Sequence, residues 1–204
     1  MLKYARFFAA AVAIGSSTLV LAAKQDEPNY LAASTMPALN NASAIVEGAS
    51  GKDVKSTIYV FMDPNCIFCH YAWEALQPYE AAGLQVHWIP LGFLKPDSMG
   101  KAAALLQSQN GPQLMRVLET RFSEKNESGG IDPLRDIPFA TQMKINSNAQ
   151  LFKKLGFDGT PTIIYMTSTG KWADVSGLPP LTSLPEILRL PEQPENEPNL
   201  QRFR

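Results

Sequence analysis

Two cysteines, Cys66 and Cys69, are the residues of this chain whose type and spacing most directly indicate chemistry. A thiol attacks a disulfide as its thiolate, and a nearby second thiol can displace the first sulfur from the resulting adduct. A disulfide between residues this close closes a very small loop and adds little stability, because the loop-closure entropy that a bridge removes grows with loop length. The spacing therefore favours thiol–disulfide exchange over a structural bridge, with Cys66 as the nucleophile and Cys69 as the resolving thiol.

The same cysteines could instead belong to a zinc site, since His70 and His87, the two histidines of the chain, would complete a Cys2His2 set. The second half of such a site normally carries two ligands at short spacing, whereas a predicted helix end and strand separate these histidines. We therefore expect no metal. His70 is either a partly exposed helix residue or a neighbour that stabilises the Cys66 thiolate, and His87 is expected to be structural.

The elements around the cysteines are predicted to position them. Residues 57–62 form a continuous apolar run rich in β-formers, which is typical of a strand covered on both faces. Residues 63–65 break this strand, and a helix over residues 66–82 follows, with Gly83 as its C-terminal stop. Residues 84–91 form a second apolar strand. The crossover is long enough for the two strands to pair in parallel.

This arrangement places Cys66 at the first turn of a helix. Free backbone N–H groups and the helix dipole favour negative charge there, and such a position can lower a cysteine pKa to about 3.5–7.5. Cys69 lies one turn further along the helix, from where it can reach Cys66. We expect Cys66 to be exposed and Cys69 to be buried.

The segment after the second strand is predicted to be mostly helical. Ser98 can cap a helix that runs to about residue 109, and Pro112 suits the first turn of a helix that runs to about residue 122. Residues 124–138 are polar and broken by glycine and proline, so we expect a loop. Ser147 can cap a last short helix that stops at Gly156.

The β pattern then returns, and the ends of the chain differ from its middle. Residues 160–166 and 171–175 are expected to form a hairpin, followed by a short helix over residues 181–190. Residues 191–204 carry three prolines among three glutamates and are expected to be disordered. Residues 24–55 are expected to be a loose leader, in which only residues 44–46 could add an edge strand.

The first residues predict the compartment. Lys3 and Arg6 precede residues 7–22, which are apolar or small and uncharged, and this is the layout of a secretory signal peptide over residues 1–23. The apolar run is shorter than the roughly 20 residues that a spanning helix needs, although a retained anchor is the alternative. Across the whole chain, 18 basic and 19 acidic residues nearly cancel. We therefore expect no nucleic-acid partner.

Taken together, these features resemble one family, the DsbC/DsbG periplasmic thiol–disulfide interchange proteins, and its DsbG branch in particular. The stretches that carry the resemblance are residues 59–66 (YVFMDPNC), Cys69, residues 92–98 (GFLKPDS) with the alanine-rich segment after them, Leu155-Gly156, Thr160-Pro161, residues 164–166 (IYM) and residues 177–179 (GLP). The resemblance implies an α/β, thioredoxin-like domain over residues 56–190. A helical insertion at about residues 98–156 would separate its first βαβ unit from the hairpin that begins at a cis-proline.

The resemblance also implies roles for residues distant from the cysteines. Pro161 would be cis and would place its loop beside the sulfurs, where backbone groups pair with a substrate chain. Thr160 would flank the sulfurs and tune them, with Ile67 and Phe68. At the two positions between the cysteines, the family has glycine or proline followed by tyrosine. Ile67-Phe68 departs from this pattern, so the resemblance does not imply a value for the reduction potential of the pair. Pairs of this architecture span about −270 to −120 mV.

Residues 24–55 are too short for the N-terminal dimerisation domain of the family, so we expect a monomer with weak isomerase activity. The function that the resemblance implies is a periplasmic oxidoreductase that acts on disulfides or sulfenic acids of secreted proteins, uses no cofactor beyond its cysteine pair, and exchanges electrons with a membrane partner. Two alternatives are a disulfide donor and a thioredoxin-fold chaperone or assembly module in which redox chemistry is incidental.

Overall fold

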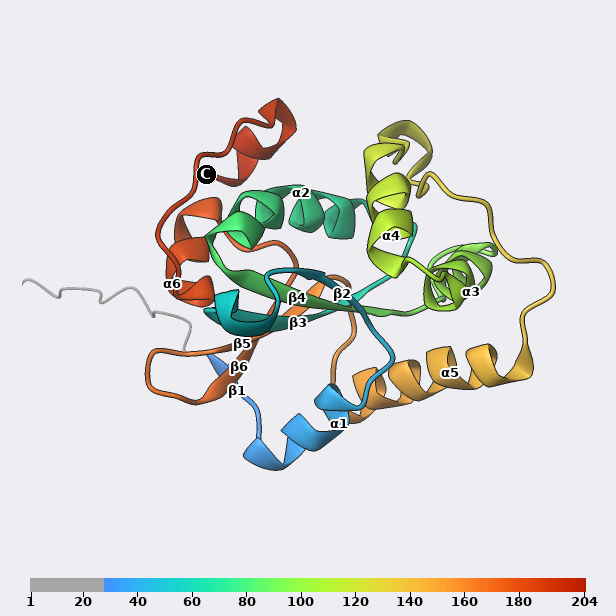
Figure 1. Ribbon diagram of the computed structural model, residues 1–204, viewed down its shortest axis with the longest axis horizontal. Coiled ribbons are helices and arrows are strands. Elements are labelled where there is room, and N and C mark those ends of the chain that lie inside the picture. Colours follow the sequence, from blue (N-terminus) through green and yellow to red (C-terminus); the bar gives the residue numbers. More distant parts are fainter. Residues whose placement is uncertain (1–27) are drawn as a thin grey trace, which may run out of the picture.

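The chain is described as a computed structural model over residues 28–204 (Figure 1). The predicted signal peptide, residues 1–23, lies outside the described residues. One sheet holds the strands β1 (Asn29–Tyr30), β2 (Ile45–Gly48), β3 (Ser56–Met62), β4 (Leu84–Pro90), β5 (Thr162–Met166) and β6 (Trp172–Ser176). The helices are α1 (Met36–Asn40), α2 (Ile67–Ala82), α3 (Ser98–Gln107), α4 (Gly111–Thr120), α5 (Phe139–Lys154) and α6 (Leu184–Leu188).

The sheet has the strand order β1–β6–β5–β3–β4–β2. The strands β3 and β4 pair in parallel through the crossover helix α2, as the sequence predicts, and their last residues Met62 and Pro90 lie opposite each other. The predicted hairpin is also confirmed, because β5 and β6 pair antiparallel and β5 lies beside β3. The C-terminal ends of β3 and β4 and the N-terminal end of β5 therefore lie at the same end of the sheet, next to one another along its strand order β5–β3–β4.

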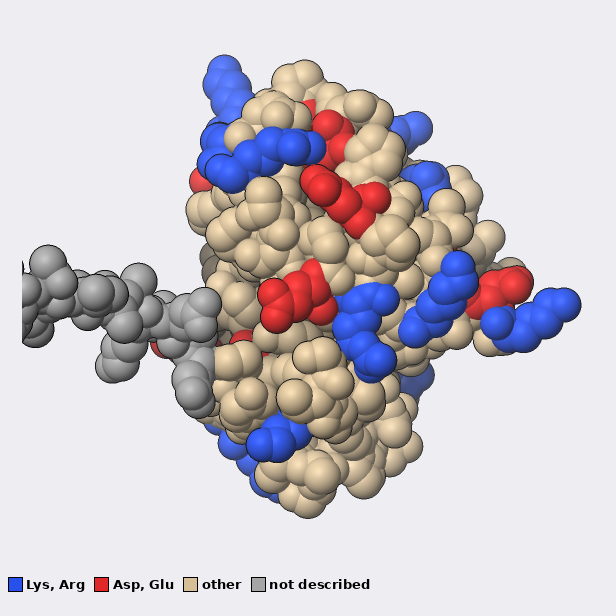
Figure 2. Space-filling model, turned by 90° about the vertical axis from the view of Figure 1, so that its left-hand side faces the viewer, with Lys and Arg blue, Asp and Glu red and all other residues tan. Residues whose placement is uncertain are grey.

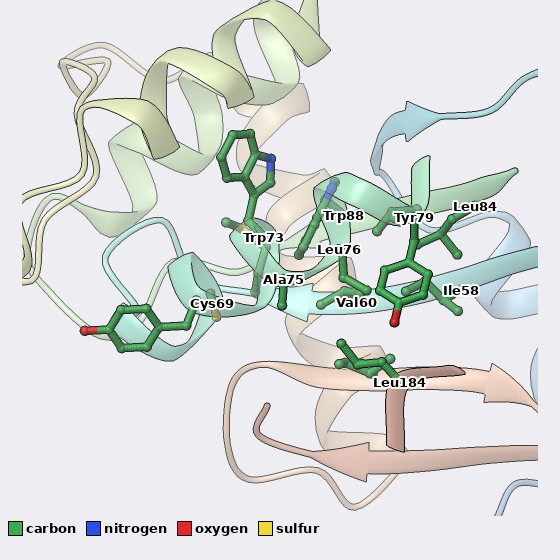
Figure 3. Packing of buried hydrophobic residues seen from close by; sticks show 14 of the residues in the cluster. Ile58, Val60, Cys69, Trp73, Ala75, Leu76, Tyr79, Leu84, Trp88 and Leu184 are labelled. Carbon is green, nitrogen blue, oxygen red and sulfur yellow. The ribbon is translucent and has the colours of Figure 1, made fainter. Parts of the chain in front are cut away.

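Two apolar clusters cover the two faces of this sheet. Along β3, Ile58, Val60 and Met62 point into a large cluster with α2, α4 and α6, whereas Tyr59 and Phe61 point into a second cluster with α1 and α5. Figure 1 shows these helices on opposite sides of the sheet, and Figure 3 shows side chains of α2 packing against β3. The alternation follows from the two-residue period of a strand.

The helical insertion differs in detail from its prediction. The helices α3 and α4 are present, but Asp97 rather than Ser98 is the residue before α3, and the Ser98 hydroxyl bonds to Asp63 instead. The short helix predicted from Ser147 is wrong, because α5 already begins at Phe139, directly after Pro138. Asn148 is buried on α5 and bonds to the backbone of Ser43 and Pro90, so tertiary contacts support a helix with little apolar patterning of its own.

The prediction of a loose leader is wrong for the described part of residues 24–55. The strand β2 pairs with β4 at the edge of the sheet, as residues 44–46 suggested, and β1 pairs with β6 at the opposite edge. Leu39 on α1 is almost fully buried in the second apolar cluster. The domain therefore includes elements well before residue 56.

The prediction of a disordered C-terminal tail is also wrong. Residues Pro198–Phe203 form a 3-10 helix, and Leu200 is fully buried in the large apolar cluster. The Arg202 guanidinium lies 4.4 Å from the centre of the Tyr71 ring, and Asn199 donates a hydrogen bond to Glu74, both on α2. One buried leucine and the contacts with α2 hold this segment in place, although its composition is typical of a disordered chain.

On the face shown in Figure 2, Lys and Arg side chains lie among Asp and Glu side chains, with uncharged surface between them. Within residues 28–204, none of the helices is both long and apolar enough to span a membrane.

We expect Leu200→Ala to lower the free energy of unfolding by about 2 kcal/mol or more, since it removes a fully buried side chain from the main core. The exposed neighbour Gln201 provides the matched control, and Gln201→Ala should change stability by about 0.5 kcal/mol or less. Urea unfolding followed by circular dichroism measures both. Equal stabilities for the two variants would show that the tail does not pack on the domain.

Candidate functional site

Cys66 occupies the N-cap of α2. Its backbone is extended, the helix begins at Ile67, and the Cys69 N–H donates a hydrogen bond of 3.3 Å to the Cys66 sulfur. The Cys66 N–H in turn donates to the carbonyl oxygen of Asp63, which closes the turn between β3 and α2. Backbone N–H groups at a helix start lack partners within the helix. The sulfur therefore supplies one of them with an acceptor.

The loop before β5 provides the second contact of this sulfur. The Thr160–Pro161 peptide bond is cis, as the family resemblance implies, and the Cys66 thiol donates a hydrogen bond of 3.2 Å to the Thr160 carbonyl oxygen. Thr160 is half-buried and Pro161 is buried. Residues separated by more than ninety positions thus meet because β3 and β5 are neighbours in the sheet.

The surroundings of Cys66 favour its thiolate. The hydrogen bond from the Cys69 thiol has the largest effect, and the Thr160 side chain and the backbone N–H groups of Cys69 and Phe68 act in the same direction. Burial opposes them, since it disfavours the charged form. The net result lowers the pKa of Cys66 to about 7.

Cys69 has the opposite character. Its side chain is fully buried in the large apolar cluster between α2 and the sheet, where Figure 3 shows it. Burial raises the pKa of Cys69 well above its ordinary value, and the hydrogen bond to Cys66 adds to this effect. The pair therefore holds one thiol that ionises near neutral pH and one that keeps its proton.

The expected exposure of Cys66 is wrong in degree. Cys66 is only 6% exposed, because the Thr160 loop covers its sulfur, whereas Cys69 is buried as expected. Of the two residues between the cysteines, Ile67 is half-buried and Phe68 is 49% exposed. Little of Cys66 is therefore accessible from solvent, whereas the Phe68 ring two positions later is half exposed.

His70 does not lie where the sequence placed it. It is buried rather than partly exposed, its ring stacks on Phe122, and its two nitrogens face Glu119 and Glu74 at 3.0 and 3.4 Å. Burial opposes its protonation, but the hydrogen bond and the charge of Glu119 outweigh this and raise the pKa of His70. The side-chain contacts of His70 therefore link α2 to α4. Its one bond to Cys66 is the helical hydrogen bond of its backbone N–H to the Cys66 carbonyl oxygen, so the predicted tuning of the Cys66 sulfur by the His70 ring stays a prediction.

His87 does not lie near the other three proposed zinc ligands. It lies on β4, bonds to Gln85 and packs its ring against Tyr59, on the face opposite to α2. Within residues 28–204, no group of three or more His, Cys, Asp and Glu side chains is arranged to hold a metal ion. The structure thus does not bring the four proposed zinc ligands together.

Sequence reasoning missed two polar residues at this site, Asp63 and Asn65. Residues 63–65 indicated only a break after β3, yet Asp63 is fully buried and Asn65 is 2% exposed. A carboxylate that directly precedes a predicted redox-active turn was the only available indication. Three of the four hydrogen-bond donors to Asp63 lie 30 or more positions further along the chain.

Comparisons with known proteins agree with this geometry. The family model for the thioredoxin-like domain matches residues 44–190. The chain is 32% identical over 137 residues to the thiol:disulfide interchange protein DsbG of Pseudomonas aeruginosa, and 32% identical over 142 residues to DsbG of Escherichia coli. Each match covers 67% of this chain but only 52% and 54% of the respective relative, so the chain spans about half the length of these relatives.

A solved structure supports the fold alone. The periplasmic thioredoxin-like protein from Salmonella enterica serovar Typhimurium superposes with a TM-score of 0.60 at 22% identity, over 78% of this chain and 96% of that chain.

The thiolate fraction of Cys66 should rise with pH around a midpoint near 7, because its neighbours lower its pKa to about that value. Cys69→Ala removes the largest of these effects, so the midpoint should move upward. A rise of one unit would reduce the thiolate fraction at pH 7 about fivefold. Ultraviolet absorbance of the thiolate in the reduced protein measures the midpoint.

The control is Cys66→Ser, in which only the buried Cys69 can react. Its alkylation at neutral pH should be slow and should not show the midpoint near 7. An unchanged midpoint in Cys69→Ala would contradict the assignment of the Cys69 hydrogen bond as the main cause.

Proposed function

Because the chain belongs to the thioredoxin-like domain family, we propose that it is a thiol–disulfide oxidoreductase of the reductase or isomerase type, which acts on exported proteins in the periplasm. The observation that carries the proposal is the pair of unlike thiols at the start of α2. Cys66 ionises near neutral pH, and Cys69 lies buried one helical turn further along and keeps its proton.

The exchange proceeds in two displacements. The Cys66 thiolate attacks one sulfur of a substrate disulfide, which forms a mixed disulfide and releases the first substrate sulfur as a thiol after it takes up a proton. Cys69 then loses its proton and attacks the Cys66 sulfur, which releases the second substrate thiol. The substrate gains two electrons and two protons, and the protein is left with a Cys66–Cys69 disulfide.

A sulfenic acid would follow the same route. Attack by the Cys66 thiolate on the sulfenic sulfur forms the mixed disulfide and releases water once the leaving hydroxide is protonated. Displacement by Cys69 again leaves the oxidised pair. A dithiol partner must then return two electrons, and we assign this step to a membrane redox protein.

Substrate binding is assigned to the backbone next to the pair. Thr160 and Pro161 lie beside Cys66, and an extended substrate chain can pair with exposed backbone in the manner of an added strand. Ile67 and Phe68 flank the sulfur, so they are the residues of choice for tuning the reduction potential. Thr160 joins them through its contact with the Cys66 sulfur.

Export and oligomeric state are part of the proposal. The layout of residues 1–23 supports export with cleavage of a signal peptide, and N-terminal sequencing of the exported protein tests it. We propose a monomer without a cofactor beyond the cysteine pair and without a nucleic-acid partner. Light scattering of the purified protein measures the oligomeric state.

Insulin reduction by dithiothreitol should be accelerated by the wild-type protein and not by Cys66→Ser, which lacks the nucleophile. Cys69→Ser is the matched variant, because it retains the nucleophile and should accumulate a mixed disulfide that a non-reducing gel detects. Equal insulin reduction by the wild type and by Cys66→Ser would exclude the enzyme and favour the chaperone or assembly module. The reduction potential of the pair, measured against glutathione, decides between a reductase and a disulfide donor.

A further inference from the structure

The turn that joins β3 to α2 carries two buried polar side chains, and the chemistry described above does not use either of them. Asp63 is fully buried and Asn65 is 2% exposed, although both precede the nucleophile by three residues or fewer. Burying a carboxylate is costly unless its oxygens receive hydrogen bonds. The partners of these two side chains therefore show what the turn is attached to.

The Asp63 carboxylate receives four hydrogen bonds. One oxygen accepts from the Asn65 N–H at 3.0 Å and from the Ser98 hydroxyl at 2.6 Å. The other accepts from the N–H groups of Phe93 and Leu94 at 2.8 and 3.1 Å. One carboxylate thus joins the turn before Cys66 to the turn after β4 and to the start of α3.

The Asn65 amide makes a second set of contacts with the helical insertion. Its oxygen accepts from the Lys101 ammonium at 2.8 Å and from the Gly129 N–H at 3.2 Å. Its nitrogen donates to Asp97 at 2.8 Å and to the Ser98 hydroxyl at 2.9 Å. Every donor and acceptor site of this amide is therefore used.

Close packing supports the same connection. A Cβ atom added at Gly129 would lie 2.3 Å from the Pro64 carbonyl oxygen, so the insertion loop rests directly on the backbone of the turn. Lys101 is buried and also pairs with Asp97 at 2.9 Å. The turn between β3 and α2 therefore contacts the helical insertion through both Pro64 and Asn65.

The position of the nucleophile depends on this turn. The Asp63 carbonyl oxygen accepts the hydrogen bond of the Cys66 N–H at 2.9 Å, and the Cys66 sulfur meets the Thr160 carbonyl oxygen at 3.2 Å. Thr160 belongs to a separate loop, so its contact with Cys66 requires the turn to stay in one place.

We propose that Asp63 and Asn65 are positioning residues for the exchange reaction, which clamp the turn before Cys66 to the helical insertion and thereby hold the Cys66 sulfur against the Thr160 loop. The exchange reaction is the function proposed above, so this part of the inference rests on that proposal. The clamp is a separate statement about the position of the Cys66 sulfur. Asp63 does not act as the base for Cys69, because donors already occupy both of its oxygens.

Asp63→Asn tests the clamp with the exchange of one oxygen for an NH2 group. This group cannot accept from the donors that the lost oxygen served, so the turn should loosen from the insertion. We expect the pKa of Cys66 to rise, because the Thr160 side chain and the N–H groups at the helix start would lose their alignment with the thiolate. The thiolate fraction at pH 7 and the rate of reaction with glutathione disulfide should each fall severalfold. Thiolate absorbance and stopped-flow kinetics measure the two effects.

The matched control is Asn148→Asp, the reverse exchange at another fully engaged polar side chain. Asn148 is 1% exposed and ties α5 to the backbone of Ser43 and Pro90, on the face of the sheet opposite to α2. This variant should lose stability without moving the pKa of Cys66. If Asp63→Asn behaves in the same way, the role of Asp63 is only structural and the proposal fails.

Ser98→Ala separates position from charge, and it keeps the test decisive if Asp63→Asn does not fold. It removes hydrogen bonds to both Asp63 and Asn65 but leaves the carboxylate in place. We expect a smaller upward shift of the Cys66 pKa. Loss of a negative charge near Cys66 would by itself lower its pKa, so Ser98→Ala, which keeps that charge, is decisive: no shift in this variant would overturn the clamp. Because these readings need no protein substrate, they remain valid even if insulin reduction refutes the proposed function.

Discussion

The chemistry of this protein depends on the competition for one sulfur at the start of α2. As a thiol, Cys66 donates to the Thr160 carbonyl oxygen, and this contact is lost when the proton leaves. As a thiolate, it is stabilised by donors that the helix start supplies, among them the Cys69 N–H. Burial opposes the charge, so neither form prevails strongly. A pKa of about 7 is the balance, and it places the change of state within the neutral range.

The resolving thiol needs the opposite environment, and the core provides it. Cys69 packs in the same apolar cluster as Leu76 and Val60, so it remains protonated while Cys66 is free to react. Once Cys66 is bound in a mixed disulfide, its sulfur no longer carries the negative charge that helped to hold the proton on Cys69. The core that stabilises the domain thus also sets the order of the two displacements.

The sequence predicts the elements whose own residues specify them, and it fails where partners lie far along the chain. The strand β3 is apolar on both faces and β4 is apolar over most of its length, so local pattern sufficed for them, and the spacing of Cys66 and Cys69 sufficed for the reactive pair. The cis bond before Pro161 followed only from the family resemblance. The buried Leu200 of the tail and the Asn148 contacts of α5 depend on tertiary packing that composition does not reveal.

The turn before Cys66 illustrates the same limit at the site itself. Asp63 and Asn65 directly follow the apolar strand β3, and a local analysis can only interpret them as the end of that strand. A buried carboxylate is seldom the most stable choice, since apolar packing of similar volume often does as well or better. Apolar side chains, however, cannot accept hydrogen bonds from the backbone of Phe93 and Leu94 or from Ser98. A polar side chain at position 63 therefore specifies where the turn lies, and the reactive sulfur lies at the end of that turn.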